Sequence, residues 1–293
     1  MNTKPQFTSP LKNISDTAFL VATYRAMESE RADALFQDPF AAILSGEHGK
    51  KIVEQLAGGS KQSWFLVART YILDHWILRL IKNEQIDAVL NLAAGLDTRA
   101  YRLTLPSDLK WYDVDLPDIL HYKETLLKDH PPTCQLKYIK LDLSNLEARN
   151  QLFLQVAQTS QKVLVISEGF LMYLNPAQVA SLSQDLSKHA QFKFWLAELI
   201  GPLQLKLIKR RWGHHFKAAN AVMNFAPREG MEFFNPYGWT PLEFKSSLLE
   251  AVKINRAPSA ASLLARFKFL FPKFLVKKLN TAGIALLKNS SSH

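Results

Sequence analysis

The clearest candidate for a chemical site lies at positions 87–102, where the sequence reads DAVLNLAAGLDTRAYR. The apolar run 88–92 predicts a strand covered on both faces of a parallel sheet. Gly95 follows it and marks a point where the backbone either needs a positive φ or passes very close to another group. Because ligands of doubly wound folds bind at the carboxyl ends of strands, this turn predicts a nucleoside-cofactor site. The alternative is an ordinary strand, turn and helix.

An acid stands at the distance in sequence that such a site requires. The segment 110–116, KWYDVDL, predicts a second strand ending in Asp115, twenty residues beyond Gly95. A carboxylate there accepts hydrogen bonds from the hydroxyl pair of a ribose, or else caps the next helix. One glycine stands where the dinucleotide fingerprint has three, so a pyrophosphate cradle is not indicated. The pattern therefore favours S-adenosylmethionine, an adenosine cofactor without phosphates, over NAD.

The rest of the chain must supply the elements that position this turn. Strand candidates recur with helix-like stretches between them, which indicates a βαβα order and a mostly parallel sheet. They cover residues 88–92, 111–114, 138–141, 163–167 and 192–199, and the last strands are expected around 249–255 and 282–288. Helices are expected before the first strand, over 16–36 and 64–81.

Length and composition limit the class of protein. The chain has 293 residues and is 47% apolar, enough for one large α/β domain or a core with a smaller cap. No long uncharged apolar run and no signal peptide are evident, so we expect a cytoplasmic protein without a membrane span. The single cysteine, Cys134, is interpreted as structural. No His, Asp or Glu cluster has metal-ligand spacing, so no metal is expected.

The formal net charge of +10 raises the question of an anionic partner. Much of the excess lies at 206–211 (KLIKRR) and 266–278 (RFKFLFPKFLVKK). For the second segment, the favoured interpretation is a helix and strand packed on the core with solvated lysines, because Pro272 interrupts any long amphipathic helix. The alternative is an amphipathic surface element for anionic membranes.

Four motifs that follow one another along the chain resemble those of a known protein family. They are NLAAGLDTRAYRL (91–103), DVDLPDIL followed by Lys123, LDL (141–143) and SEGFLMYL (167–174). Together they resemble the leucine carboxyl methyltransferase-like family of S-adenosylmethionine-dependent methyltransferases, which includes tetracenomycin-type polyketide O-methyltransferases. The segment 17–41 and the pair Arg69-Thr70 with Asp74 also look like this family. The resemblance spans about residues 15–200 and fades beyond.

The resemblance implies an architecture. It is a Rossmann-like class I methyltransferase fold, with a mostly parallel seven-stranded sheet and helices on both faces. Residues 1–86 would form a helical cap and residues 87–293 the core, with a lid insertion at about 200–230. Aromatic residues of that insertion, Trp212, Phe216 and Phe225, suggest a large apolar or aromatic acceptor.

The resemblance also implies roles around the cofactor. Arg69 would pair with its carboxylate, and Arg25 would assist there or form a structural salt bridge. Gly95 would let the backbone approach the methionine part, while Asp97 and Arg99 would hold the turn or contact neighbouring loops. The family often has glycine where this chain has Ala93, whose methyl group would crowd the cofactor unless φ is negative.

Further roles fall on the later strands. Asp115 would bind the ribose. Asp142 would bind the adenine amino group, and Leu143 would present a backbone amide to the adenine. Without the resemblance, Asp142 also fits the start of a helix. Glu168 closes a strand in an apolar setting and would lie beside the cofactor. Tyr173 would line the acceptor pocket or belong to the core.

These roles predict methyl transfer to an oxygen of a small molecule, or less favourably of a protein C-terminal carboxylate. A carboxylate acceptor is already ionised, whereas a phenol benefits from a general base. His214 and His215 are weak candidates for that base, since tandem histidines beside KLIKRR are typical of a surface. No nucleic-acid partner is expected. Two alternatives remain: an NAD-linked oxidoreductase, and a catalytically idle basic protein that binds nucleic acid or anionic membrane.

Overall fold

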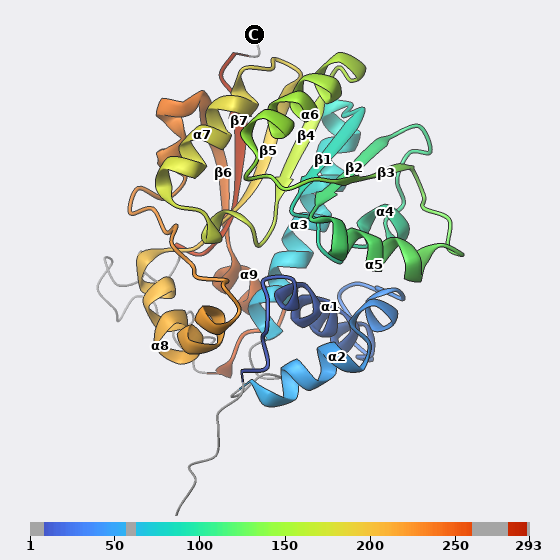
Figure 1. Cartoon of the computed structure of the whole chain (residues 1–293), viewed down its shortest axis with the longest axis vertical. Coiled ribbons are helices and arrows are strands. Elements are labelled where there is room, and N and C mark those ends of the chain that lie inside the picture. The colour runs from blue at the N-terminus through green and yellow to red at the C-terminus, as the bar shows by residue number, and fades with distance from the viewer. Residues whose placement is uncertain (1–8, 57–62, 260–280, 292–293) are drawn as a thin grey trace, which may run out of the picture.

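The fold was analysed in a computed structural model that describes residues 9–56, 63–259 and 281–291. Its centre is a seven-stranded sheet with the order β3-β2-β1-β4-β5-β7-β6 (Figure 1). Every recorded pairing among the first five strands is parallel, and β7 runs antiparallel to both neighbours. The strands are β1 (Ala88–Leu92), β2 (Lys110–Asp115), β3 (Gln135–Lys140), β4 (Val163–Ser167), β5 (Phe192–Leu199), β6 (Trp239–Ser246) and β7 (Gly283–Asn289).

Helices cover both faces of this sheet. The α-helices are α1 (Asp16–Ser29), α2 (Ala41–Gln55), α3 (Ser63–Glu84), α4 (Arg99–Arg102), α5 (Pro117–Leu127), α6 (Leu146–Thr159), α7 (Pro176–Ser187), α8 (Pro202–Ala218) and α9 (Ser247–Lys253). Two 3₁₀ segments are η2 (Leu171–Tyr173) and η3 (Gly230–Tyr237). None of these described helices is long and apolar enough to cross a bilayer.

Alternation along the strands divides the core into two layers. Val89 and Leu164 belong to a cluster with α3, α4 and α5, while their neighbours Leu90 and Val165 pack with α6 and α7. Because successive side chains of a strand point to opposite faces, the fully buried strands β1 and β4 contribute to both layers. The buried thiol of Cys134 lies in the first layer, and burial raises its pKa to about 12, so the thiol stays protonated near neutral pH.

The first five strands were predicted at the correct places, and the mostly parallel sheet is confirmed. The expected strand at 249–255 is wrong, because α9 occupies 247–253 and the sixth strand lies earlier, at Trp239–Ser246. Ser246 caps this helix: its side chain accepts a hydrogen bond from the Leu249 amide. A short apolar run of this kind does not distinguish helix from strand by periodicity.

The N-terminal helix also differs from its predicted length. It ends at Ser29 rather than near position 36. The Ser29 hydroxyl donates to the Arg25 carbonyl and accepts from the Asp38 amide, so the chain turns back on the helix end. α1 and α2 then pack on each other at the carboxyl edge of the sheet (Figure 1). The boundary of a cap at residue 86 stays a prediction, and the basic segment 266–278 lies outside the described residues.

Candidate functional site

A cavity of about 1350 Å³ opens at the carboxyl edge of β1, β2, β4 and β5. Residues of α1, α3 and α8 form its other walls. Ligand pockets commonly measure about 300–1,000 Å³, so this one has room for two small molecules at once. Its lining is mostly apolar, with charged side chains gathered at the strand ends.

Gly95 and Asp115 meet at one end of this cavity. The Gly95 amide donates to Asp115 Oδ2 at 2.6 Å, and the Leu116 amide donates to Oδ1 at 2.7 Å. Gly95 has φ +50°, and a Cβ added to it would lie 3.1 Å from Cβ of Ala18 on α1. Both reasons for glycine, positive φ and close approach, therefore apply at this turn. Burial raises the pKa of the Asp115 carboxyl despite the two amide donors.

Ala93 lies in the same turn and is a point of strain. Its φ is +55°, in the left-handed region that non-glycine residues rarely adopt. The condition under which alanine would be accommodated, a negative φ, is therefore not met. The Ala93 side chain lines the cavity.

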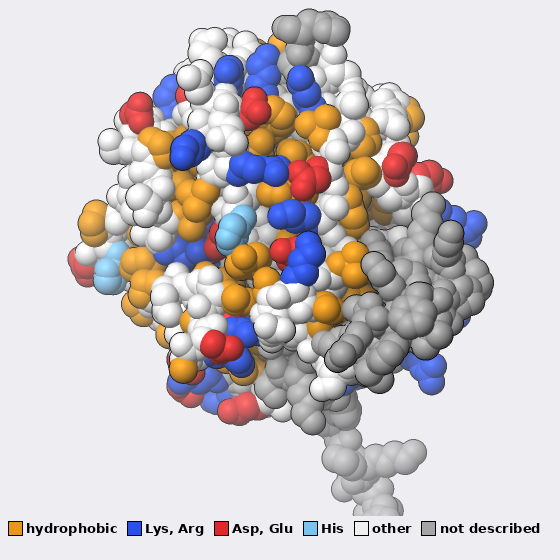
Figure 2. Space-filling view, turned by 180° about the vertical axis from the view of Figure 1, so that it is seen from behind, with side chains coloured by type: hydrophobic (Ala, Val, Ile, Leu, Met, Phe, Trp, Pro, Cys, Tyr) orange, Lys and Arg blue, Asp and Glu red, His pale blue; other side chains and the backbone are white. Residues whose placement is uncertain are grey.

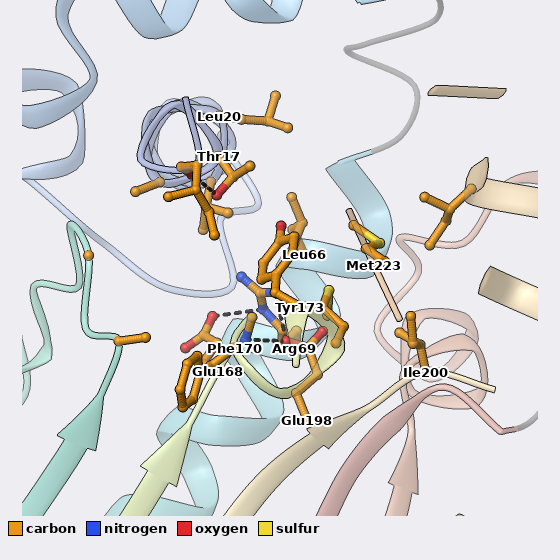
Figure 3. Close-up of a pocket in the computed structure, with 18 of the residues that line it drawn as sticks. Thr17, Leu20, Leu66, Arg69, Glu168, Phe170, Tyr173, Glu198, Ile200 and Met223 are labelled. Carbon is orange, nitrogen blue, oxygen red and sulfur yellow. Dashed lines mark hydrogen bonds and ion pairs between the residues drawn. The ribbon is translucent and has the colours of Figure 1, made fainter. Parts of the chain in front are cut away.

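Arg69 lies between two carboxylates at the base of the cavity (Figure 3). Its Nε lies 2.7 Å from Glu168 Oε1, and its Nη1 lies 2.9 Å from Glu198 Oε2. The Gly169 amide also donates to Glu198 Oε2, at 2.6 Å. These contacts join the middle of α3 to the ends of β4 and β5. Arg69 itself is buried, at 5% exposure.

Glu168 is fixed from a second side by Arg99. Arg99 Nη1 donates to Glu168 Oε2 at 2.7 Å and to Asp97 Oδ2 at 2.6 Å, while its Nε donates to Asp74. Asp97 in turn accepts from the Arg99 amide, which confirms that this pair holds the turn. Burial opposes the charged form of Glu168, but Arg69 and Arg99 outweigh it and lower its pKa.

Glu198 is the site residue that the sequence analysis did not single out. It ends an apolar strand, FKFWLAEL, just as Glu168 follows VLVIS, so the same signal was present in the sequence. Burial, together with the nearby charge of Glu168, raises the pKa of the Glu198 carboxyl. Two neighbouring carboxyl groups with pKa values shifted in opposite directions are a common feature of acid-base sites.

Arg25 has two structural partners. Its Nε donates to Asp38 Oδ2 at 2.8 Å, and its Nη2 donates to the Leu96 carbonyl at 2.6 Å. The structural salt bridge expected as an alternative is thus present. Arg25 also lines the cavity, so its role toward a cofactor stays a prediction.

Asp142 and Leu143 lie at the end of β3 and line the cavity. Asp142 is exposed, and its Oδ1 accepts from the Ser144 amide at 2.8 Å, but the next helix begins at Leu146 and is capped by Asn145, so Asp142 does not start it. Leu143 is buried at 8% exposure. Their roles toward adenine stay predictions.

Tyr173 lies on η2 beside Arg69 and Glu198 and lines the cavity (Figure 3). Burial raises the pKa of its phenol to about 12. The phenol therefore stays protonated near neutral pH.

Neither His214 nor His215 is among the described residues that line the cavity. His214 is exposed, and His215 is buried with Nδ1 3.2 Å from the Ser9 hydroxyl. Of the three aromatic residues expected near an acceptor, Trp212 and Phe216 line the cavity. The expectation for Phe225 is wrong, since it packs in the core with Phe233 and Phe234. No metal-ligand cluster occurs in the part of the chain described.

Comparisons with known proteins agree with this geometry. A family described as leucine carboxyl methyltransferase matches residues 18–187, more than half of the chain. A protein of Mycobacteroides abscessus named "Putative S-adenosyl-L-methionine-dependent methyltransferase" is 32% identical over 59% of this chain and 61% of its own. One of the same name from Mycobacterium marinum is 34% identical over 56% of this chain and 58% of its own. The chain thus spans about three fifths of the length of these relatives.

Two solved structures share the fold. A DUF574 family protein from Streptomyces avermitilis has a TM-score of 0.57 at 12% identity, over 93% of this chain and 96% of that one. A protein from Thermobifida fusca, described as a "putative methyltransferase", has a TM-score of 0.56 at 13% identity, over 96% and 95% of the two chains. At this identity the likeness concerns the arrangement of elements alone.

Proposed function

This chain belongs to the leucine carboxyl methyltransferase family, and from that premise we propose that it is an S-adenosylmethionine-dependent O-methyltransferase with an apolar small-molecule acceptor. The observation that carries the proposal is the meeting of the Gly95 amide and the Asp115 carboxylate, 2.6 Å apart, at the carboxyl ends of β1 and β2. A carboxylate at this edge is placed to accept from ribose hydroxyls.

The residues of the cavity fit this cofactor. Asp115 would hold the ribose, and Asp142 with Leu143 would hold the adenine. Among the described residues, Arg69 pairs through Nε with Glu168 and through Nη1 with Glu198. Its remaining nitrogen, Nη2, would bind the carboxylate of the cofactor. When bound, the cofactor supplies a methyl group on a positively charged sulfonium.

The charge of the buried network also favours a cation. Its members form a continuous set of ion pairs with one more carboxylate than guanidinium groups. They are Arg25, Arg69, Arg99 and Arg102 with Asp38, Asp74, Asp97, Glu168 and Glu198. S-adenosylmethionine carries one positive charge in excess, whereas NAD carries phosphates, so the network complements the former.

The acceptor side supports an apolar molecule with one oxygen nucleophile. Leu66, Ile200 and Met223 line the wall beside Tyr173 (Figure 3). A carboxylate acceptor needs no base, whereas a hydroxyl would give its proton to a nearby group. Glu198 suits that task better than the two histidines, because it lines the cavity and its pKa is raised. We place the enzyme in the cytoplasm, as composition suggests.

Isothermal titration tests the cofactor. We expect S-adenosylhomocysteine to bind with one site per chain and NADH not to bind. Binding of NADH alone would contradict the proposal and favour an oxidoreductase. Mass spectrometry of the purified protein would then detect carried cofactor, and a turnover screen with apolar phenols and carboxylic acids would identify the acceptor class.

A further inference from the structure

Helix α8 and the loop that follows it carry an unbalanced positive charge. From residue 199 to residue 228 the sequence has no aspartate or glutamate, although the whole chain has 26. The same stretch contains six cations, all exposed: Lys206, Lys209, Arg210, Arg211, Lys217 and Arg228. By contrast, Figure 2 shows Lys and Arg interspersed with Asp and Glu on the face opposite to the view of Figure 1.

The inner side of α8 is anchored to the protein. Leu205, Ile208 and Phe216 pack with Met172 and Met223. These contacts hold the helix at the carboxyl edge of the sheet, where the cavity opens (Figure 1). The helix therefore presents its lysines to solvent from a fixed position. None of Lys206, Lys209 and Lys217 forms an ion pair with another residue in the described ranges.

The mouth of the cavity combines these cations with exposed apolar groups. Leu207 is 54% exposed and Val222 is 42% exposed, and both line the cavity. Arg210 and Arg211 line it as well. Cations around exposed apolar side chains match the interface of an anionic bilayer, which offers phosphate charge above and hydrocarbon below.

From these observations we propose that the outer face of α8 docks on an anionic phospholipid membrane and turns the mouth of the cavity toward the bilayer. An apolar molecule dissolved in the lipid would then reach the cavity without crossing water. Nucleic acid is the rival partner for such a patch. It is less favoured because single-stranded nucleic acid needs exposed aromatic rings for stacking, whereas the exposed groups here are aliphatic. The docking itself does not depend on the cofactor.

Sedimentation with vesicles tests the proposal on the full chain. We expect the protein to sediment with vesicles of phosphatidylcholine that contain about one third phosphatidylglycerol, and to be released by high salt. Vesicles of phosphatidylcholine alone should bind it far more weakly. Each lysine near the surface contributes about 1 kcal/mol, so Lys206→Gln, Lys209→Gln and Lys217→Gln together should weaken binding about a hundredfold.

A matched triple variant removes the same charge elsewhere. Lys82→Gln, Lys128→Gln and Lys137→Gln change exposed lysines on α3, just after α5 and on β3, away from α8. We expect this variant to bind vesicles within about threefold of the unchanged chain. Equal loss in both triple variants would show a general effect of net charge and overturn the proposal. Failure of the unchanged chain to bind anionic vesicles, or preference for single-stranded RNA over them, would overturn it as well.

Discussion

Arg69 and Glu198 are 129 positions apart in the sequence, yet Arg69 Nη1 lies 2.9 Å from Glu198 Oε2. The pair joins the middle of α3 to the end of β5, and Glu168 contacts the same guanidinium from β4. A buried arginine shared by two carboxylates couples the position of a helix to the carboxyl edge of the sheet. Any ligand that contacts Arg69 would therefore also contact a rigid part of the fold.

The first prediction concerns the charge of Arg69. Arg69→Met leaves two buried carboxylates without their shared cation, so the free energy of unfolding should fall by about 3–5 kcal/mol. Urea unfolding measures this. Arg69→Lys keeps the charge but not the planar fork, so it should fold better and still bind S-adenosylhomocysteine at least about tenfold more weakly. Arg79→Lys, on the exposed side of the same helix, is the control and should change neither quantity. Unchanged affinity of Arg69→Lys would remove Arg69 from the cofactor site.

The second prediction uses the opposite pKa shifts of Glu168 and Glu198. The pKa of Glu168 is lowered in the folded protein, so its contribution to stability is present above its unfolded pKa and is lost on acidification. The pKa of Glu198 is raised, so the folded protein binds a proton at Glu198 more tightly than the unfolded chain does. The stability that this proton contributes is present at low pH and is lost as pH rises through the folded pKa of Glu198.

The corresponding variants should therefore respond to pH in opposite ways. The deficit in unfolding free energy of Glu168→Gln should grow as pH rises to about 5 and then stay constant, whereas that of Glu198→Gln should shrink as pH rises above about 4. Urea unfolding at several pH values measures both. Parallel pH profiles for the two variants would contradict the assignment of opposite shifts.

Sequence patterns predicted the parts of this site that are local. The strand, Gly95 and the acid twenty residues later form a short-range signal, and the structure brings them into contact. Arg69 was found only through the resemblance, because an arginine in an apolar helix has no periodicity that reveals a partner 99 residues away.

The parts that escaped prediction depend on tertiary contacts. Glu198 carried the same sequence signal as Glu168, but its significance arises from Arg69 and the Gly169 amide, which only the sheet order places beside it. The predictions that Phe225 lies near the acceptor and that residues 249–255 form a strand failed for a related reason. Burial and capping decide whether an aromatic residue lines a cavity and whether a short apolar run is helical.

A third prediction addresses the strain at Ala93, whose φ is +55°. Ala93→Gly should raise the free energy of unfolding by about 1 kcal/mol, because glycine adopts this conformation without steric cost. If the methyl group crowds the cofactor, the affinity for S-adenosylhomocysteine should increase as well. Ala94→Gly is the control: its φ lies outside the left-handed region, so the change should lower stability by about 0.4–1 kcal/mol. Loss of stability in Ala93→Gly would contradict the inference of strain.

A fourth prediction concerns the pH dependence of cofactor binding through Asp115. Burial raises the pKa of this carboxyl, so it becomes protonated at a higher pH than an ordinary aspartate. A protonated carboxyl accepts hydrogen bonds from ribose hydroxyls poorly, so the affinity for S-adenosylhomocysteine should fall as pH is lowered toward pH 5. Asp115→Asn should bind it at least about tenfold more weakly at neutral pH, since charged acceptors form stronger hydrogen bonds.

The shape of the two pH profiles distinguishes a direct role from a structural one. Isothermal titration between about pH 5 and pH 8 should show a slope in the unchanged chain and a flat profile in Asp115→Asn, because the amide does not titrate. Asp142→Asn is the matched control, because it removes another carboxylate of the same cavity and should leave the slope in place. If Asp115→Asn retained both the affinity and the slope, Asp115 would serve only to cap α5 and to fix the Gly95 amide, and the ribose would have to be held by another group.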